Sequence, residues 1–184
     1  MKKLFYVPIF IYCSLIIACK SDDQASDPGN YQTPLPEATQ TGKGTFACYV
    51  DGIAYIAKPN EITSYYQQYT QGYYVFSVSG AKEEKPIFSI SLGSSDVAFV
   101  VGTTYDLNEK KYSNQWGGGY FVYDSDGGYE SYTNGTTYKG ELTITKLDSE
   151  KQIISGTFWF DVKEPKTGKT RKVRDGRFDV VANF

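Results

Sequence analysis

The chain has no histidine, and this absence limits the chemistry open to its 184 residues. Without an imidazole there is no Ser-His or Cys-His pair to activate a nucleophile, and the commonest zinc ligand is missing. We therefore do not expect a serine hydrolase or a metallohydrolase of the usual design. We predict that the protein is not an enzyme, with no catalytic residue, no metal site and no cofactor.

Cysteine is scarce too, at Cys13, Cys19 and Cys48. The first two fall in an N-terminal stretch that we expect to be removed or modified, so Cys48 stands alone and no intramolecular disulfide is available. The stability of the fold must therefore come from its hydrophobic core. Cys48 alternates with Phe46 and Val50 on one face of a predicted strand, which indicates a small core residue rather than a nucleophile.

Charge of neither sign dominates, with 19 basic and 21 acidic side chains and a net charge of −2. Removal of Lys2 and Lys3 with a leader would leave 17 basic side chains against 21 acidic ones, a net charge of −4. A mildly acidic domain is a poor general binder of polyphosphates. We predict no nucleic acid partner.

The N-terminus has the order of a secretory signal peptide. Lys2 and Lys3 are followed by the apolar run Leu4–Ala18, which at 1.5 Å per residue spans roughly 22 Å, short of the roughly 30 Å of a bilayer core. Pro8 further weakens a membrane-spanning helix. The ending Ile16-Ile17-Ala18-Cys19 resembles the lipobox of bacterial lipoprotein precursors. We expect residues 1–18 to be removed and Cys19 to be lipidated, with a non-lipidated signal peptide as the alternative.

Residues 19–43 are predicted to be a lipidated cysteine followed by a disordered tether. The segment is rich in Ser, Asp, Gln, Thr and Pro and too poor in aliphatic residues to offset the entropy of ordering. Two or three acyl chains hold a protein firmly in a bilayer. Lys20-Ser21-Asp22-Asp23 resembles the acidic export signal of surface lipoproteins in the Bacteroidota, or else is a solvated acidic linker. We expect an outer-membrane lipoprotein at the cell surface.

Residues 44–184 have the size of one ordinary domain. Tyr, Phe, Val, Ile and Thr alternate with polar residues between turn signals, the pattern of an all-β fold. It predicts a single antiparallel β-sandwich or partly closed barrel of about eight to ten strands. Phe158 and Phe160 belong in the core, Asp51-Gly52 and Asp175-Gly176 are read as turns, and Glu61–Gln68 is the one segment read as a helical turn.

Several motifs of this region resemble an uncharacterised family of Bacteroidota lipoproteins. They are Gly44-Thr45-Phe46, Val50-Asp51-Gly52, Ile154-Ser155-Gly156-Thr157-Phe158-Trp159-Phe160 and Asp175-Gly176-Arg177-Phe178-Asp179. The resemblance covers most of the expected domain. Because that family has no established activity, it implies no catalytic residue.

Aromatic residues make up 16% of the chain, with 17 tyrosines, and supply the candidate ligand contacts. Exposed Tyr and Trp give flat amphipathic surfaces that suit proteins and sugars, although Tyr also suits half-buried strands. A second tyrosine group occupies the Gln- and Thr-rich stretch between Tyr65 and Tyr73. The candidate contacts are Trp116, Tyr120, Tyr123 and Tyr129 around a glycine-rich loop, and Trp159 on the polar face of its strand.

Two charged clusters have two interpretations each. Asp124-Ser125-Asp126-Gly127-Gly128 is read as a hairpin turn in preference to a calcium loop with Asp124, Asp126 and Glu130 as oxygen ligands, since it lacks the remaining ligand positions of an EF-hand. A basic run is read as a solvated edge hairpin, with contact to an anionic lipopolysaccharide or glycan as the alternative. That run consists of Lys163, Lys166, Lys169, Arg171, Lys172, Arg174 and Arg177.

These observations together predict a lipid-anchored protein of the cell envelope that binds a glycan or an envelope protein. The alternatives are a lipocalin-like binder of a small apolar ligand and a carboxylate-based glycan hydrolase. A flat Tyr/Trp patch would favour the first, an apolar internal pocket the second, and two facing carboxylates in a cleft the third.

Overall fold

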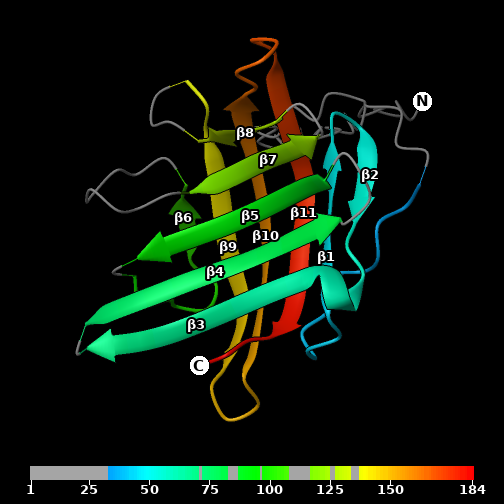
Figure 1. Ribbon diagram of the computed structural model, residues 1–184. Helices are drawn as coiled ribbons and strands as arrows, with labels where there is room; N and C mark the ends of the chain where they lie inside the picture. The colour runs from blue at the N-terminus through cyan, green and yellow to red at the C-terminus, as the bar shows by residue number, and fades with distance from the viewer. Residues whose placement is uncertain are drawn as a thin grey trace, which may run out of the picture.

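Two antiparallel β-sheets pack against each other in the part of the chain that the structure describes (Figure 1). The computed structural model describes residues 33–70, 72–82, 87–95, 97–107, 117–124, 127–133 and 137–184. The predicted all-β sandwich is confirmed, with eleven strands among these residues where about eight to ten were expected.

The six-stranded sheet has the order β2-β1-β11-β10-β9-β6 and the five-stranded sheet the order β3-β4-β5-β7-β8. The first is formed by β1 (Thr45–Val50), β2 (Ile53–Ile56), β6 (Thr104–Asp106), β9 (Gly140–Asp148), β10 (Ile153–Lys163) and β11 (Thr170–Val181). The second is formed by β3 (Ile62–Thr70), β4 (Tyr73–Lys82), β5 (Ile87–Ser95), β7 (Gly118–Asp124) and β8 (Gly127–Tyr132). A 3-10 turn, η1 (Pro59–Glu61), precedes β3. Within the described residues there is no helix of the length and apolarity needed to cross a membrane.

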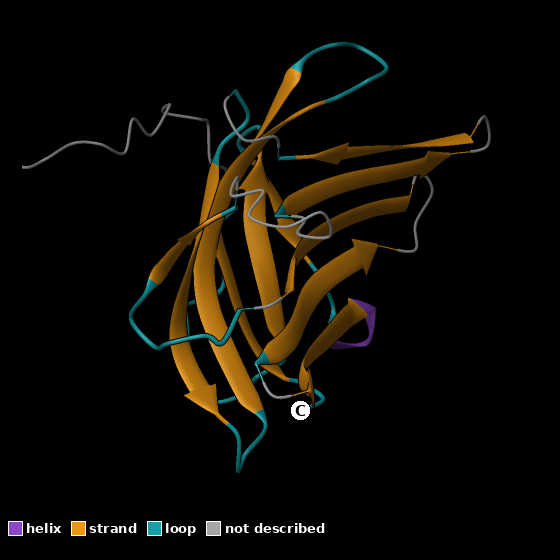
Figure 2. Ribbon diagram, turned by 90° about the vertical axis from the view of Figure 1, so that its left-hand side faces the viewer, coloured by secondary structure: helices purple, strands orange, loops and turns teal. Residues whose placement is uncertain are grey.

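The core lies between the two layers, which Figure 2 shows side by side. Phe46 and Phe160 of the six-stranded sheet and Phe76 of the five-stranded sheet have no exposed surface. Burying a side chain of this size stabilises the fold by roughly 1.5–3 kcal/mol. The predicted core positions Phe158 and Phe160 are confirmed, and Cys48 is a fully buried core residue as expected.

The hairpin between β1 and β2 follows the sequence prediction. Asp51 and Gly52 both have positive φ, 49° and 83°, and Val50 pairs with Ile53 across the turn. Positive φ at both central residues is what a two-residue hairpin turn requires, and it explains the Asp-Gly pair.

The helical turn expected over Glu61–Gln68 is wrong. The 3-10 turn ends at Glu61, whose carboxylate accepts a hydrogen bond from the backbone N–H of Lys58 at 2.7 Å. From Ile62 the chain is extended and pairs with β4. Tyr66, predicted in the helical turn, is buried in the core. The side chains of this segment therefore alternate between the two faces of the sheet, as in a strand.

The turn expected at Asp175-Gly176 is also wrong, because β11 runs through it as one strand. The pairing of β11 with β10 shifts here, so that Phe158 lies opposite Gly176 and Phe160 opposite Val173. Asp175 takes a φ of 49°, which marks a β-bulge. Asp and Gly suit a bulge because both tolerate positive φ, which is also why this pair suits a two-residue turn. The basic run is therefore not at a sheet edge, since β11 lies between β1 and β10.

The C-terminal residues join the two sheets at one edge. After β11 the chain crosses to the edge strand β3, where Tyr65 and Asn183 form a parallel bridge and the backbone N–H of Tyr66 donates to the carbonyl of Asn183 at 2.8 Å. The hydroxyl of Ser64 donates to the carbonyl of Val181 at 3.0 Å. The sandwich is thus partly closed along this side.

The described chain begins within the segment predicted to be a tether. Residues 33–43, which we call the strap, lie against the outward side of β1 and β11: Tyr49 donates to the carbonyl of Thr33 at 3.0 Å and Arg177 to that of Pro36 at 3.1 Å. The strap is therefore held on the six-stranded sheet. Residues 19–32 lie outside the described part, and for them the tether stays a prediction.

Candidate functional site

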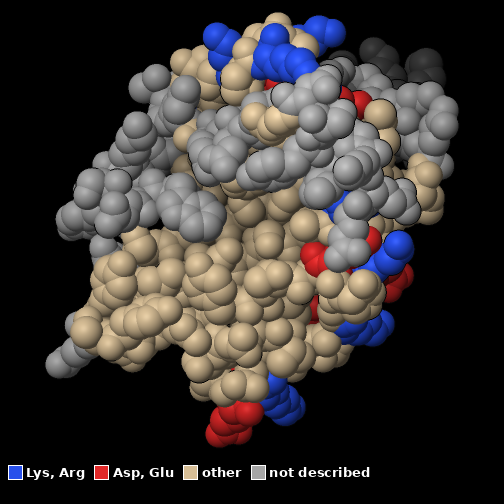
Figure 3. All heavy atoms as spheres, viewed as in Figure 1, with Lys and Arg blue, Asp and Glu red and all other residues tan. Residues whose placement is uncertain are grey.

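The outward side of the five-stranded sheet is uncharged over three neighbouring strands. Phe76 and Val78 of β4 and Ile90 and Leu92 of β5 point into the core, so the residues between them point outward. The outward residues are Thr63, Tyr65 and Gln67 of β3, Tyr73, Val75, Ser77, Ser79 and Ala81 of β4, and Ser89, Ser91, Gly93 and Ser95 of β5. None of them has a charge. We call this set the neutral face; Figure 3 shows it as a tan surface without blue or red atoms.

Tyrosine side chains lie on the neutral face and at its end. Tyr65 is half-buried on β3, and Tyr73 is 38% exposed at the start of β4. Tyr69 lies beside it where the β3–β4 register shifts, is 63% exposed, and its ring centre is 6.3 Å from that of Tyr73. Four residues of strand place the backbones of Tyr65 and Tyr69 about 13 Å apart. The tyrosines therefore offer two separated aromatic contacts.

Small residues form the middle of the neutral face. Ser77 pairs with Gly93, and Ser91 pairs with Gly119 of β7. A Cβ atom added at Gly119 would lie 2.7 Å from the ring of Phe121, which folds over this glycine. The backbone is thus low between the tyrosines of β3 and the ring of Phe121, and the small residues there are covered: Ser77, Ser91 and Ser95 are only 9%, 6% and 7% exposed.

The outward side of the six-stranded sheet is charged, and its charges pair with one another. The indole N–H of Trp159 donates to the carboxylate of Glu141 at 3.1 Å. The guanidinium of Arg174 lies 5.3 Å from the centre of the Trp159 ring and forms an ion pair with Asp161 at 2.7 Å. The donor and one ring face of Trp159 are therefore already engaged within the protein.

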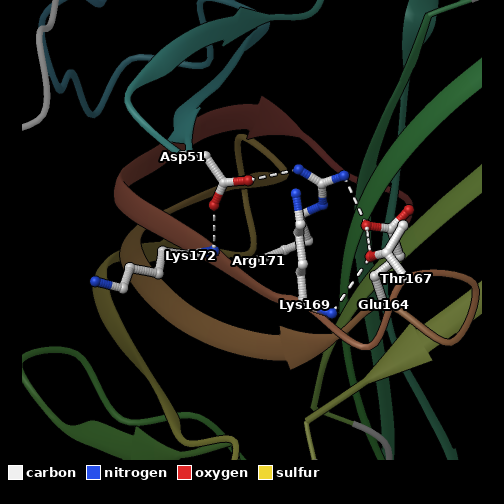
Figure 4. A network of polar contacts seen from close by, with 6 residues as sticks. All are labelled: Asp51, Glu164, Thr167, Lys169, Arg171 and Lys172. Carbon is white, nitrogen blue, oxygen red and sulfur yellow. Dashed lines mark hydrogen bonds and ion pairs between the residues drawn. The ribbon is translucent and has the colours of Figure 1, made fainter.

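A polar network holds the end of the β10–β11 hairpin against the β1–β2 turn (Figure 4). Arg171 pairs with Asp51 at 2.8 Å and with Glu164 at 2.6 Å, and Thr167 donates to Glu164 at 2.8 Å. The hydrogen bond that Arg171 donates to Asp51 raises the pKa of Arg171 against the opposing effect of burial, and the charge of Glu164 adds to the rise. Glu164 is only 4% exposed, so its charge depends on this pairing. The network is a brace between two turns.

Asp179 of β11 fixes the strap. Its carboxylate accepts hydrogen bonds from the hydroxyls of Thr39 and Ser155 at 2.6 and 2.7 Å. The backbone N–H groups of Thr41, Gly42 and Lys43 donate to it at 3.0, 2.8 and 3.2 Å. Burial alone would raise the pKa of this carboxyl, but the hydrogen bonds outweigh it and lower the pKa to about 2. Asp179 therefore serves the attachment of the strap.

A family model described as a domain of unknown function, DUF6252, matches residues 63–182. The chain belongs to the DUF6252 family. The matched part of the DUF6252 domain runs from β3 through the end of β11 and contains the neutral face, Trp159 and Asp179. No curated protein and no solved structure matches the chain. The expectation of an uncharacterised domain family is thereby confirmed, while its assignment to lipoproteins of the Bacteroidota stays a prediction.

The sequence-predicted contact residues do not meet on one surface of the DUF6252 domain. Tyr120 points into the core and is 4% exposed, because it alternates in phase with the buried Val122. Trp159 lies on the opposite sheet, half-buried. Four further predicted residues fall outside what the structure describes. Trp116 and Cys19 lie outside the described residues, as do the side chains of Tyr123 and Tyr129, whose backbones belong to the β7–β8 hairpin.

The neutral face had a signal in the sequence that residue-type reasoning passed over. No charged residue occurs between Glu61 and Lys82, although this stretch supplies two long strands of a sandwich. Strands with one solvated side normally carry Lys, Glu or Arg on it. The absence of charge, read together with Tyr65 and Tyr73, marks the surface.

Acidic side chains of the described residues form no group that could hold a metal. Among those residues no three of His, Cys, Asp and Glu come together in a metal-binding arrangement. The β7–β8 hairpin forms as predicted, with Asp124 opposite Gly127. Asp126 and the side chains of Asp124 and Glu130, the carboxylates of the alternative calcium loop, lie outside the described part.

Proposed function

We propose that the protein is a lipid-anchored member of the cell envelope whose DUF6252 domain binds a neutral glycan on the neutral face. The observation that carries this proposal is the combination of the Tyr65 and Tyr73 rings with the accessible polar side chains of Thr63 and Gln67, on a surface whose described residues have no charge. Tyrosine rings stack on apolar faces of sugars, and serine, threonine and glutamine side chains exchange hydrogen bonds with their hydroxyls.

A neutral ligand fits this surface better than a charged one. A charged partner gains its specificity from opposite charges, which the twelve outward residues of β3, β4 and β5 do not supply. A protein of the envelope is the competing partner, and the experiment below separates the two.

The packing of the domain supports a surface site over the two other candidates. The space between the sheets holds Phe46, Phe76 and Phe160 with no exposed surface, which disfavours a lipocalin-like cavity there. A carboxylate-based hydrolase needs two facing carboxylates in a cleft. The described residues of the neutral face offer no carboxylate, so a non-catalytic binding role is the simpler proposal.

Binding of glycans by the chain from Lys20 to Phe184, which retains every described residue, tests the site. On a glycan array we expect selective binding of uncharged sugars, weakened on the order of tenfold by Tyr65→Ala or Tyr73→Ala. Trp159→Ala is the matched control, an aromatic residue on the opposite sheet, and should bind as the unmodified chain does. Equal losses in all three variants, or binding of none by a folded chain, would refute the neutral face as a glycan site.

Anchoring is a separate part of the proposal. The leader and lipobox ending at Cys19 support a lipoprotein, and Lys20-Ser21-Asp22-Asp23 supports export to the surface of a Bacteroidota outer membrane. Cells given a labelled fatty acid should incorporate it into the protein, and Cys19→Ala should abolish both the label and membrane fractionation. Incorporation that survives Cys19→Ala would refute this assignment.

A further inference from the structure

The long side chains at the edge of the neutral face form a row along one strand. β3 is the edge strand of the five-stranded sheet (Figure 1), and Thr63, Tyr65 and Gln67 lie on its outward side at every second position. All three are exposed or half-buried. After Tyr73, the outward side of the neighbouring strand β4 has only valine, serine and alanine. A ligand at this edge therefore meets the side chains of β3 first.

An exposed pair of aromatic rings lies at the end of this row. Tyr69 is 63% exposed and Tyr73 is 38% exposed, and their ring centres are 6.3 Å apart with the ring planes inclined at 63°. In such an edge-to-face pair, one ring keeps both of its faces clear of the other. The pair therefore offers aromatic surface to a ligand without first having to separate.

Tyr65 and the Tyr69–Tyr73 pair are too far apart to contact the same sugar ring. Tyr69 follows Tyr65 by four residues along β3, and Tyr73 precedes Ser77, the partner of Tyr65, by four residues along β4. Either path is about 13 Å long. A pyranose ring is similar in width to a tyrosine ring, so a chain of roughly three or more linked sugars is needed to cover such a path.

The line between the two aromatic contacts is extended and can exchange hydrogen bonds. Gln67 lies between Tyr65 and Tyr69 on β3, and its amide both donates and accepts. Thr63 continues the row two residues beyond Tyr65 with a hydroxyl. Sugars joined by β-1,4 links form an extended chain whose ring faces can lie along such a line, whereas α-1,4 links make the chain curve. A curved chain would touch one aromatic contact and leave the other.

We infer that the ligand is an extended, uncharged, β-linked glycan that lies along β3 and contacts Tyr65 and the Tyr69–Tyr73 pair at the same time. This inference rests on the proposed function of the neutral face and names the class of glycan. Once a chain has made one of the two contacts, the second becomes intramolecular, so the affinity rises above that of either contact alone. The affinity therefore depends on the length of the chain.

A series of oligosaccharides of increasing length tests this dependence. The β-1,4-linked oligomers of glucose, mannose, xylose and N-acetylglucosamine, from one unit to six, are titrated into the chain from Lys20 to Phe184 by calorimetry. We expect at least one series to bind with an affinity on the order of tenfold higher for four units than for two. The α-1,4-linked glucose oligomers are the matched control, and their affinity should rise less than about twofold over the same lengths.

Variants that remove one aromatic contact at a time distinguish a bridging chain from a single contact. Tyr65→Ala and Tyr69→Ala/Tyr73→Ala should each reduce the ratio of four-unit to two-unit affinity to about two or less. The two-unit oligomer still binds at the remaining contact, so it should lose only about half of its affinity. Tyr69→Phe/Tyr73→Phe keeps both rings, and Trp159→Ala lies on the opposite sheet, so both should keep the ratio.

Three results would overturn the inference while the neutral face remains a glycan site. They are equal affinities for short and long β-linked oligomers, an equal rise in the α-linked series, and a ratio that only one of the two contact variants reduces. Binding of another uncharged sugar on the neutral face, with none of the β-linked series bound, has the same meaning. A folded chain that binds no sugar, either on the array or in these titrations, refutes the proposed function and the inference together.

Discussion

Replacing Asp179 with asparagine tests whether one carboxylate holds the strap on the six-stranded sheet. Asparagine keeps one oxygen and replaces the other with an amide donor. Oδ2 of Asp179 accepts from the N–H groups of Thr41 and Lys43, and Oδ1 accepts from that of Gly42. Either orientation of the amide therefore places a donor against a partly buried backbone N–H.

The expected cost follows from those contacts. An unsatisfied buried N–H costs about 1–3 kcal/mol, and the remaining bonds lose the strength that the charge gave them. We expect Asp179→Asn to lower the free energy of unfolding by about 2–4 kcal/mol, measured by urea denaturation at neutral pH. Asp175→Asn, the same change at an exposed carboxylate of the same strand, should change it by less than about 0.5 kcal/mol.

The pH dependence gives a second, independent readout for Asp179. Its pKa falls from an ordinary value of 3.8 to about 2 in the folded protein. A carboxyl with a lowered folded pKa stabilises the fold above its unfolded pKa, and this stability is lost as the pH falls through the folded value. The unmodified protein should therefore lose about 2 kcal/mol between about pH 4 and pH 2 that Asp179→Asn does not lose.

Two results would refute this reasoning. One is an equal loss of stability in Asp179→Asn and Asp175→Asn; the other is a parallel decline of the unmodified protein and Asp179→Asn over the acid range. Should Asp179→Asn fail to fold, Thr39→Val removes a single bond to the carboxylate and should cost about 1 kcal/mol. Limited proteolysis should then cut within the strap before it cuts the sheets.

Three further outcomes can be checked by urea denaturation or thiol chemistry. Arg171→Met removes the guanidinium that forms the ion pair with the buried Glu164 and should cost about 3–5 kcal/mol, and much less when Glu164→Gln is added; equal costs would refute the brace. Gly156→Ala puts a Cβ 2.7 Å from the carbonyl oxygen of Thr143 and should cost about 1–3 kcal/mol; no cost would show that β9 moves aside. Burial raises the pKa of the Cys48 thiol, so a thiol reagent at about pH 8 should modify it only in urea.

The sequence predicted the faces of the strands well, because period-two alternation is a local property. Phe158 and Phe160 lie in the core as expected, and the Asp51-Gly52 turn forms where the dipeptide indicated. Neighbour relations between strands are not local. The place of β11 in the middle of its sheet depends on pairing with β1 and β10, which no pattern within the basic run reveals.

The candidate site was harder to predict than the fold. Residue type predicted Trp159 and Tyr120 as ligand contacts. Trp159 already contacts Glu141 and Arg174, however, and Tyr120 points into the core. Residue type alone does not distinguish an aromatic ring that is free from one that the protein already uses. Those partners are contributed by other strands, and the sequence shows them only after the strands have been placed.

The pairing of β1 with β11 joins the first and last strands of the described chain, and Asn183 completes the edge of β3. The six-stranded sheet cannot be finished until β10 and β11 are available, and the edge of β3 stays open until Asn183 reaches it. A chain that crosses a membrane N-terminus first would thus be unable to complete its sandwich before its last strands had crossed. Such an order of assembly keeps a polypeptide compatible with a narrow secretion channel, without a chaperone having to pull apart a prematurely formed domain.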